Sequence, residues 1–287
     1  MTNSPRQPSA WLDALAASDA PVRLGLDVLY GDHDLVEERR QRIGAAIAHY
    51  QKYFGDEPIR LFRAPGRINL RGMHVDTHGG WLNLMAHQRE VLIVAGPSHD
   101  RHSHVCNTNS TFAPLVIPCD ALTLFAGRDW PDFIATPEIQ SRVALAPGHW
   151  RNYIEGAWLR ARHAFPAHHL GGLQLVVDSN LPQGAALSSS AALCVALLHA
   201  WLGWHDLELD NDALILAAQD AEWYTGSRCG TCDQAAIVLA RPNAIIHTAL
   251  DPKAFTTANA RALSLPEALR VLVINSFTAR SISGAEK

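Results

Sequence analysis

Three consecutive serines stand between a predicted strand and a predicted helix, in the small-residue stretch 182–191 (Pro-Gln-Gly-Ala-Ala-Leu-Ser-Ser-Ser-Ala). The β-branched run 173–178 predicts the strand, and the apolar run 191–201 predicts a buried helix. Free N–H groups and the helix dipole favour an anion at such a helix start. The stretch therefore predicts a phosphate-binding loop, although not a Walker A loop, because no Gly-Lys-Ser/Thr follows. An N-capped core helix after an ordinary turn explains the same residues without a ligand.

A second polar cluster lies in residues 63–80, where Arg67, His74, Asp76 and His78 are interspersed with glycines. Glycine lets the backbone turn tightly beside such side chains. The cluster could therefore hydrogen-bond a polyol. A surface hairpin with solvated charges is the alternative.

A third candidate is the carboxylate of Asp233, which directly follows the Cys-x-x-Cys pair of Cys229 and Cys232. A structural zinc site needs four ligands, and the sequence has no second Cys pair, so metal or redox use of these cysteines is disfavoured. Asp233 precedes the apolar run 235–239. It is therefore either a partly buried base or the N-cap of that segment.

Three histidines near Cys106, at positions 99, 102 and 104, have a density typical of metal sites. Their surroundings are highly polar, and the chain has 15 histidines, so such clusters arise easily. A solvated loop is the favoured interpretation.

Several helices and strands must position these motifs. Apolar residues at helical spacing predict helices at 34–54, 150–165 and 210–224, with a shorter one at 11–17. Strands are predicted at 59–63, 91–95, 243–248 and 269–275, with a turn at 64–67 before extended structure resumes at 68–70. Residues 97–149 lack periodicity, so hairpins and loops are expected there. Because strands and helices alternate irregularly, the predicted fold class is α+β rather than a doubly wound sheet.

Composition narrows the class of protein. At 287 residues and 48% hydrophobic, the chain can bury a large core in one large domain or two. The net charge of -4, from 24 basic and 28 acidic residues, shows no excess of positive charge of the kind that binds nucleic acid or an anionic membrane. Five irregularly spaced cysteines, no signal-peptide pattern and no membrane span predict a soluble, cytoplasmic protein.

In this order, the three stretches resemble the signatures of the galactokinase branch of the GHMP small-molecule kinases. That family's first signature, Arg-x-Pro-Gly-Arg-Val-Asn-Leu-Ile-Gly-Glu-His-Thr-Asp-Tyr-x-Gly-Gly, is similar to residues 63–80, and its phosphate loop is similar to 182–191. Its Cys-Gly-x-x-Asp-Gln motif is similar to 229–234. The resemblance covers about residues 34–287.

The resemblance implies a GHMP-kinase N-terminal lobe of the ribosomal-protein-S5-domain-2 type over 34–287, after a helical extension over 1–33. The family's C-terminal ferredoxin-like lobe is expected to be largely absent, as in a truncated product, a fragment or one partner of a split enzyme. The implied activity is ATP-dependent phosphorylation of a monosaccharide at its anomeric hydroxyl, with ATP and Mg²⁺ as cofactors. A non-catalytic sugar or nucleotide sensor, or an inactive kinase fragment, is the alternative.

The resemblance also implies roles for single residues. Asp233 would accept the proton of the anomeric hydroxyl or stabilise it, and Arg67 beside it would stabilise the transferred phosphoryl group. His74 and Asp76 would contact sugar hydroxyls, and Gly230 would contact the sugar through its backbone.

The loop residues would hold the phosphates of ATP: Gly184, Ala185, Ala186, Leu187, Ser188, Ser189 and Ser190. Mg²⁺ would lie near Ser189 or Ser190, with Glu222 as its carboxylate ligand, because magnesium prefers oxygen donors.

Three positions depart from the galactokinase pattern. Met73 replaces a sugar-binding glutamate, which argues for a pentose or another sugar rather than ordinary galactose. Ala186 replaces a glycine, at a cost on the order of 1 kcal/mol if that position needs positive φ. Glu222 lies one residue nearer to Asp233 than its galactokinase counterpart, a spacing that other GHMP kinases share.

Overall fold

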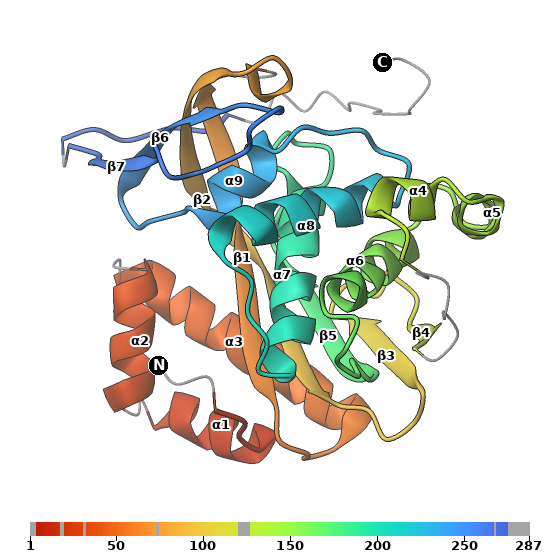
Figure 1. Cartoon of the computed structure of the whole chain (residues 1–287). Coiled ribbons are helices and arrows are strands. Elements are labelled where there is room, and N and C mark those ends of the chain that lie inside the picture. The colour runs from red at the N-terminus through yellow and green to blue at the C-terminus, as the bar shows by residue number, and fades with distance from the viewer. Residues whose placement is uncertain are drawn as a thin grey trace.

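A mixed β-sheet runs through the computed structural model, which describes residues 4–17, 20–30, 33–72, 75–119, 127–266 and 268–274. The strand order is β4-β3-β5-β2-β6-β7, with β1 paired to β2 (Figure 1). Only β3 and β5 pair in parallel among these strands; the other pairs are antiparallel. The strands are β1 (Arg60–Arg71), β2 (Gly80–Pro97), β3 (His102–Asn107), β4 (Leu115–Pro118), β5 (Leu173–Ser179), β6 (Ala244–Leu250) and β7 (Arg261–Ser264). This architecture confirms the α+β expectation.

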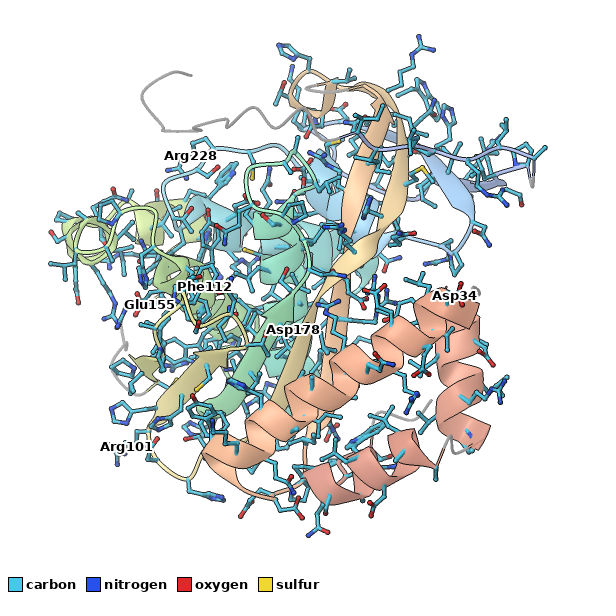
Figure 2. The ribbon with its side chains drawn as sticks, turned by 180° about the vertical axis from the view of Figure 1, so that it is seen from behind. Asp34, Arg101, Phe112, Glu155, Asp178 and Arg228 are labelled. Carbon is cyan, nitrogen blue, oxygen red and sulfur yellow. The ribbon has the colours of Figure 1, made fainter. Side chains whose placement is uncertain are left out.

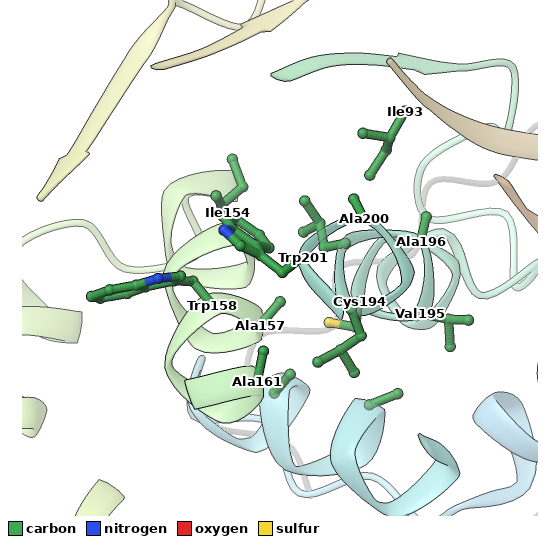
Figure 3. Packing of buried hydrophobic residues seen from close by; sticks show 14 of the residues in the cluster. Ile93, Ile154, Ala157, Trp158, Ala161, Cys194, Val195, Ala196, Ala200 and Trp201 are labelled. Carbon is green, nitrogen blue, oxygen red and sulfur yellow. The ribbon is translucent and has the colours of Figure 1, made fainter. Parts of the chain in front are cut away.

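One face of the sheet is covered by the buried helix α7 (Ser189–Trp204) and the helices around it (Figure 3). The apolar residues of α7 are buried along nearly the whole helix, as the sequence predicts for a helix that is hydrophobic all round. The neighbouring helices are α6 (Trp150–Ala164), α8 (Asn211–Trp223) and α9 (Cys232–Val238). In α6, Gly156 lets the helices approach closely, because an added Cβ would lie 2.6 Å from the Ala221 carbonyl oxygen.

The opposite face carries the long helix α3 (His33–Phe54), with α1 (Pro8–Ala16) and α2 (Ala20–Tyr30) beside it (Figure 2). Alternation along β2 explains both cores. Leu92 and Val94 face α3, whereas Ile93 and Ala95 face α7. The strand therefore buries both of its faces, which fixes its register.

The β1 strand is continuous through the segment where a turn was predicted, so the turn at 64–67 is wrong. The pairing of β1 with β2 shifts between Pro65 and Arg67, which marks a β-bulge. A bulge accommodates the proline, which has no N–H to give to the ladder. Gly66 is required there because an added Cβ would lie 3.0 Å from the Leu187 carbonyl oxygen.

The periodic helices at 34–54, 150–165 and 210–224 are confirmed as α3, α6 and α8, and the strands at 91–95, 173–178 and 243–248 lie in β2, β5 and β6. Residues 97–149 contain the expected β3–β4 hairpin but also two helices that were not predicted, α4 (Trp130–Ile134) and α5 (Pro137–Ala144). The strand predicted at 269–275 is wrong for 269–274, which form no regular element; Asn275 lies outside the described residues.

Candidate active site

The serine loop packs against the bulge of β1 at the start of α7. The Arg67 amide donates to the Leu187 carbonyl oxygen over 3.2 Å. Three alternate residues of the loop have left-handed backbones, Gly184 (φ 67°), Ala186 (φ 56°) and Ser188 (φ 56°). This winding brings a loop of small residues to the N-terminus of a 16-residue helix, as a phosphate-binding loop requires.

Asp233 and Arg67 form the centre of the site. Arg67 donates through Nε to Asp233 Oδ1 over 2.8 Å, and its Nη2 lies 2.7 Å from the same oxygen. The third guanidinium nitrogen, Nη1, donates to the Ala186 carbonyl oxygen over 2.6 Å. Asp233 lies in the first turn of α9, whose N-cap is Thr231, so the alternative of Asp233 as an N-cap is wrong. Its side chain is 32% exposed and is therefore accessible to a ligand.

Ser188 completes the contacts of this carboxylate. Its hydroxyl donates to Asp233 Oδ2, the oxygen that Arg67 does not contact. The sequence predicted Ser188 as a phosphate ligand and gave no signal for this contact, because the two residues lie 45 positions apart.

Residues 63–80, the first of the three motifs, also contact the segment that carries Asp233. The one-turn 3-10 helix η1 (Val75–Thr77) buries Asp76, and Asp76 Oδ2 accepts from the Cys232 amide over 2.8 Å. Gly230 must be glycine, because a Cβ there would overlap the Asp76 carboxylate. Asn69, which sequence reasoning missed, donates to Cys232 Sγ over 3.1 Å. The predicted sugar ligand His74, like Met73, lies outside the described residues.

Glu222 and Ser190 form an oxygen pair beside the loop. Ser190 Oγ donates to Glu222 Oε1 over 2.7 Å, and Gln234 Nε2 donates to Oε2 over 2.8 Å. Gln234 is a further residue that the sequence did not predict. A hydroxyl and a carboxylate next to a loop of small residues fit a magnesium–nucleotide ligand, since Mg²⁺ prefers oxygen donors and completes its shell with phosphate and water. These two residues would hold the metal.

The Cys-x-x-Cys pair and the histidine cluster are the two other candidate metal sites of the sequence. Within the described ranges, no group of three or more His, Cys, Asp or Glu is arranged to hold a metal ion. Cys229 and Cys232 are free, and burial raises the pKa of both thiols, that of Cys232 to about 12. His104 is bound to Asp100 over 2.8 Å on the exposed side of β3. His102 and His104 lie in strand β3, so the expected loop is wrong for these two residues.

Glu222→Gln is expected to change how stability depends on pH. Burial raises the pKa of Glu222, because the low-dielectric site disfavours the charged carboxylate. When the folded-state pKa of a carboxyl group exceeds its unfolded value, the protein loses stability as the pH rises above about 4.3, the ordinary glutamate pKa. Glutamine stays neutral, so the unfolding free energy of the variant relative to wild type should increase between about pH 4 and pH 8. Urea unfolding at several pH values measures this, and a constant difference would contradict it.

Ala186→Gly is expected to stabilise the protein by about 1 kcal/mol, because glycine adopts positive φ without the steric cost that alanine has. The matched control is Ala185→Gly. Ala185 is not among the positive-φ residues, so there glycine should destabilise by about 0.4–1 kcal/mol. Urea unfolding midpoints of both variants measure the effect. A loss of stability in both would show that Ala186 does not keep this backbone conformation in solution.

Two family models match the chain. Residues 152–241 match the GHMP kinases N terminal domain, and residues 48–97 match the galactokinase galactose-binding signature. The chain is 31% identical over 243 residues to a galactokinase of Roseiflexus sp. (strain RS-1), an alignment that covers 84% of this chain and 55% of that protein. It thus spans about half the length of the curated relatives it matches.

Solved structures share the fold. The Lactococcus lactis galactokinase complexed with galactose matches with a TM-score of 0.60 at 21% identity, over 78% of this chain and 51% of that one. The Methanococcus jannaschii mevalonate kinase matches with a TM-score of 0.51 at 14% identity, over 72% and 55%.

Residues 152–241, which include the serine loop, therefore match the GHMP kinases N terminal domain, and the chain shares its fold with a solved galactokinase, as the resemblance implied. The chain is similar to galactokinases in particular, because residues 48–97 match the galactose-binding signature and curated relatives at 31% identity are galactokinases. No helix in the described part of the chain is long and apolar enough to cross a membrane.

Proposed function

We propose that this protein binds a monosaccharide and ATP and phosphorylates the sugar at its anomeric hydroxyl. One observation carries the proposal. Asp233 accepts from Arg67 of the galactose-binding signature and from Ser188 of the serine loop, so one accessible carboxylate lies where the sugar and nucleotide motifs meet.

In the proposed reaction, Asp233 accepts the proton of the sugar hydroxyl, and Arg67 stabilises negative charge at the point of transfer. Asp76, which lies against Gly230 and accepts from the Cys232 amide, would contact the sugar together with the Gly230 backbone. ATP bound with Mg²⁺ supplies the transferable phosphoryl group, and residues 184–190 with Glu222 would hold it. Such a transfer depends mainly on positioning and electrostatics, which suits this sparse set of residues.

The sugar is proposed to differ from galactose at the edge that the glutamate replaced by Met73 binds in galactokinases. A thioether is a weak acceptor and carries no charge, so it cannot replace a glutamate that binds a sugar hydroxyl. A pentose or another monosaccharide altered at that edge fits the substitution.

Sugar-dependent ADP release over a panel of hexoses, pentoses and deoxy sugars tests the proposal, with a sugar-free reaction as the background. The product should have lost its reducing end, because phosphorylation at the anomeric oxygen blocks it, and phosphorylation elsewhere leaves it free. Saturable ATP or sugar binding without product would instead identify a non-catalytic sensor. No binding of either ligand would refute both functions.

A further inference from the structure

Ser188 occupies the N-cap position of α7 without capping the helix. Serine is favoured at N-caps because its hydroxyl accepts from a backbone N–H of the first turn. Here no such side-chain bond forms, and the residue has φ 56° and ψ 50°. The left-handed conformation is unfavourable for any residue with a Cβ, so the position combines a strained backbone with an unused cap.

The hydroxyl of Ser188 is directed at the catalytic carboxylate instead. Arg67 donates to Oδ1 of Asp233, and Ser188 donates to Oδ2. The two donors come from β1 and from the loop before α7, which lie far apart in the sequence but are hydrogen-bonded to each other through Arg67. Together they restrain rotation of the carboxylate about its Cβ–Cγ bond, which one donor alone would leave freer.

The three serines of the loop therefore differ in what they contact. Ser190 donates to Glu222, and Ser188 donates to Asp233. Ser189 makes no hydrogen bond through its hydroxyl to another residue that the structure describes, so its hydroxyl is the one available to a phosphate oxygen.

We propose that Ser188 is a positioning residue for Asp233 and not a phosphate ligand. This inference rests on the function proposed above and refines it. Ser188 holds Asp233 in the orientation in which it receives the sugar proton, and the strained backbone at Ser188 is what aims the hydroxyl away from the nucleotide.

The test compares Ser188→Gly with Ser188→Ala and Ser189→Gly in the full chain. Glycine removes the hydroxyl and fits positive φ, whereas alanine removes the hydroxyl and keeps the strain. Both Ser188 variants should lower kcat by about 10- to 100-fold, since a misplaced catalytic group has effects of this order. The Kd for ATP, measured without sugar, should stay within about twofold of wild type, because positioning acts on the chemical step. Ser188→Gly should also unfold at a urea midpoint equal to or above that of wild type.

Ser189→Gly should show the opposite pattern: a higher Kd for ATP with a smaller change in kcat. If Ser188→Gly keeps wild-type kcat, the inference fails while the proposed function stands. If it weakens ATP binding as Ser189→Gly does, Ser188 is a phosphate ligand after all. A wild-type protein that turns over no sugar would overturn the proposed function and this role with it.

Discussion

Replacing Asp233 with asparagine is expected to lower kcat for sugar phosphorylation by about 100- to 10,000-fold, the range found for removal of a general base. The amide is isosteric but cannot accept the sugar proton. It also leaves Arg67 without the anion that its Nε and Nη2 contact at 2.8 and 2.7 Å. The measurement is initial-rate kinetics at saturating ATP, on the sugar that the panel identifies.

The control for this prediction separates chemistry from folding. Asp132 is an exposed aspartate in the first turn of α4, and Asp132→Asn should leave kcat within about twofold of wild type. ATP should bind to Asp233→Asn nearly as to wild type, because Asp233 contacts the loop through the Ser188 hydroxyl, which is proposed not to bind phosphate. Full turnover in Asp233→Asn would remove Asp233 from its assigned role.

The serine loop and the long helices could be predicted because their signals are local. Apolar periodicity produces α3, α6 and α8 at their predicted places, since an amphipathic face must be buried wherever it lies. The predicted Asp210 N-cap is also present, accepting from the Ala213 amide over 2.8 Å.

The helices in 97–149 were missed although they carry a recognisable start signal. α5 begins with Pro137 at the first helical position after Thr136, and α4 has Pro131 at its second position, after Asp129 and Trp130. Proline is favoured there because its missing N–H has no intrahelical partner to lose. At five and eight residues these helices are too short for periodicity to reveal them.

The turn predicted at 64–67 is wrong because contacts with distant residues override a local signal. Pro65-Gly66 is a turn signal in isolation, but the adjacent strand β2 and the loop carbonyl of Leu187 hold it as a bulge inside one long strand. In the same way, the contacts of Ser188 with Asp233 and of Gln234 with Glu222 depend on tertiary packing. A single sequence gives their residue types but not their pairing.

A buried ion cluster behind the site has consequences for stability. Glu90 lies on β2 with its side chain only 2% exposed, and it accepts from the Tyr30 hydroxyl over 2.6 Å and from Arg63 Nε. Nitrogen atoms of Arg39 and Arg42, on α3, lie 3.6 and 3.7 Å from its Oε1. One carboxylate thus contacts cations from α3 and from β1, the strand that also carries Arg67.

Glu90→Gln is expected to destabilise the protein by about 3–5 kcal/mol, because three arginines lose the buried anion that they share. The second carboxylates of Arg39 and Arg42 are Glu38, which is 61% exposed, and Asp178. Arg39, whose side chain is 2% exposed, has no solvent to replace the lost anion. Urea unfolding measures the effect. The matched control is Glu38→Gln, which removes a carboxylate 2.7 Å from the same arginine but 61% exposed, and should cost less than about 1 kcal/mol. Equal losses in the two variants would mean that the cluster is hydrated in solution. A large loss confined to Glu90→Gln would mean that this buried carboxylate, in addition to the apolar core beneath α3, holds the N-terminal helices on the strands.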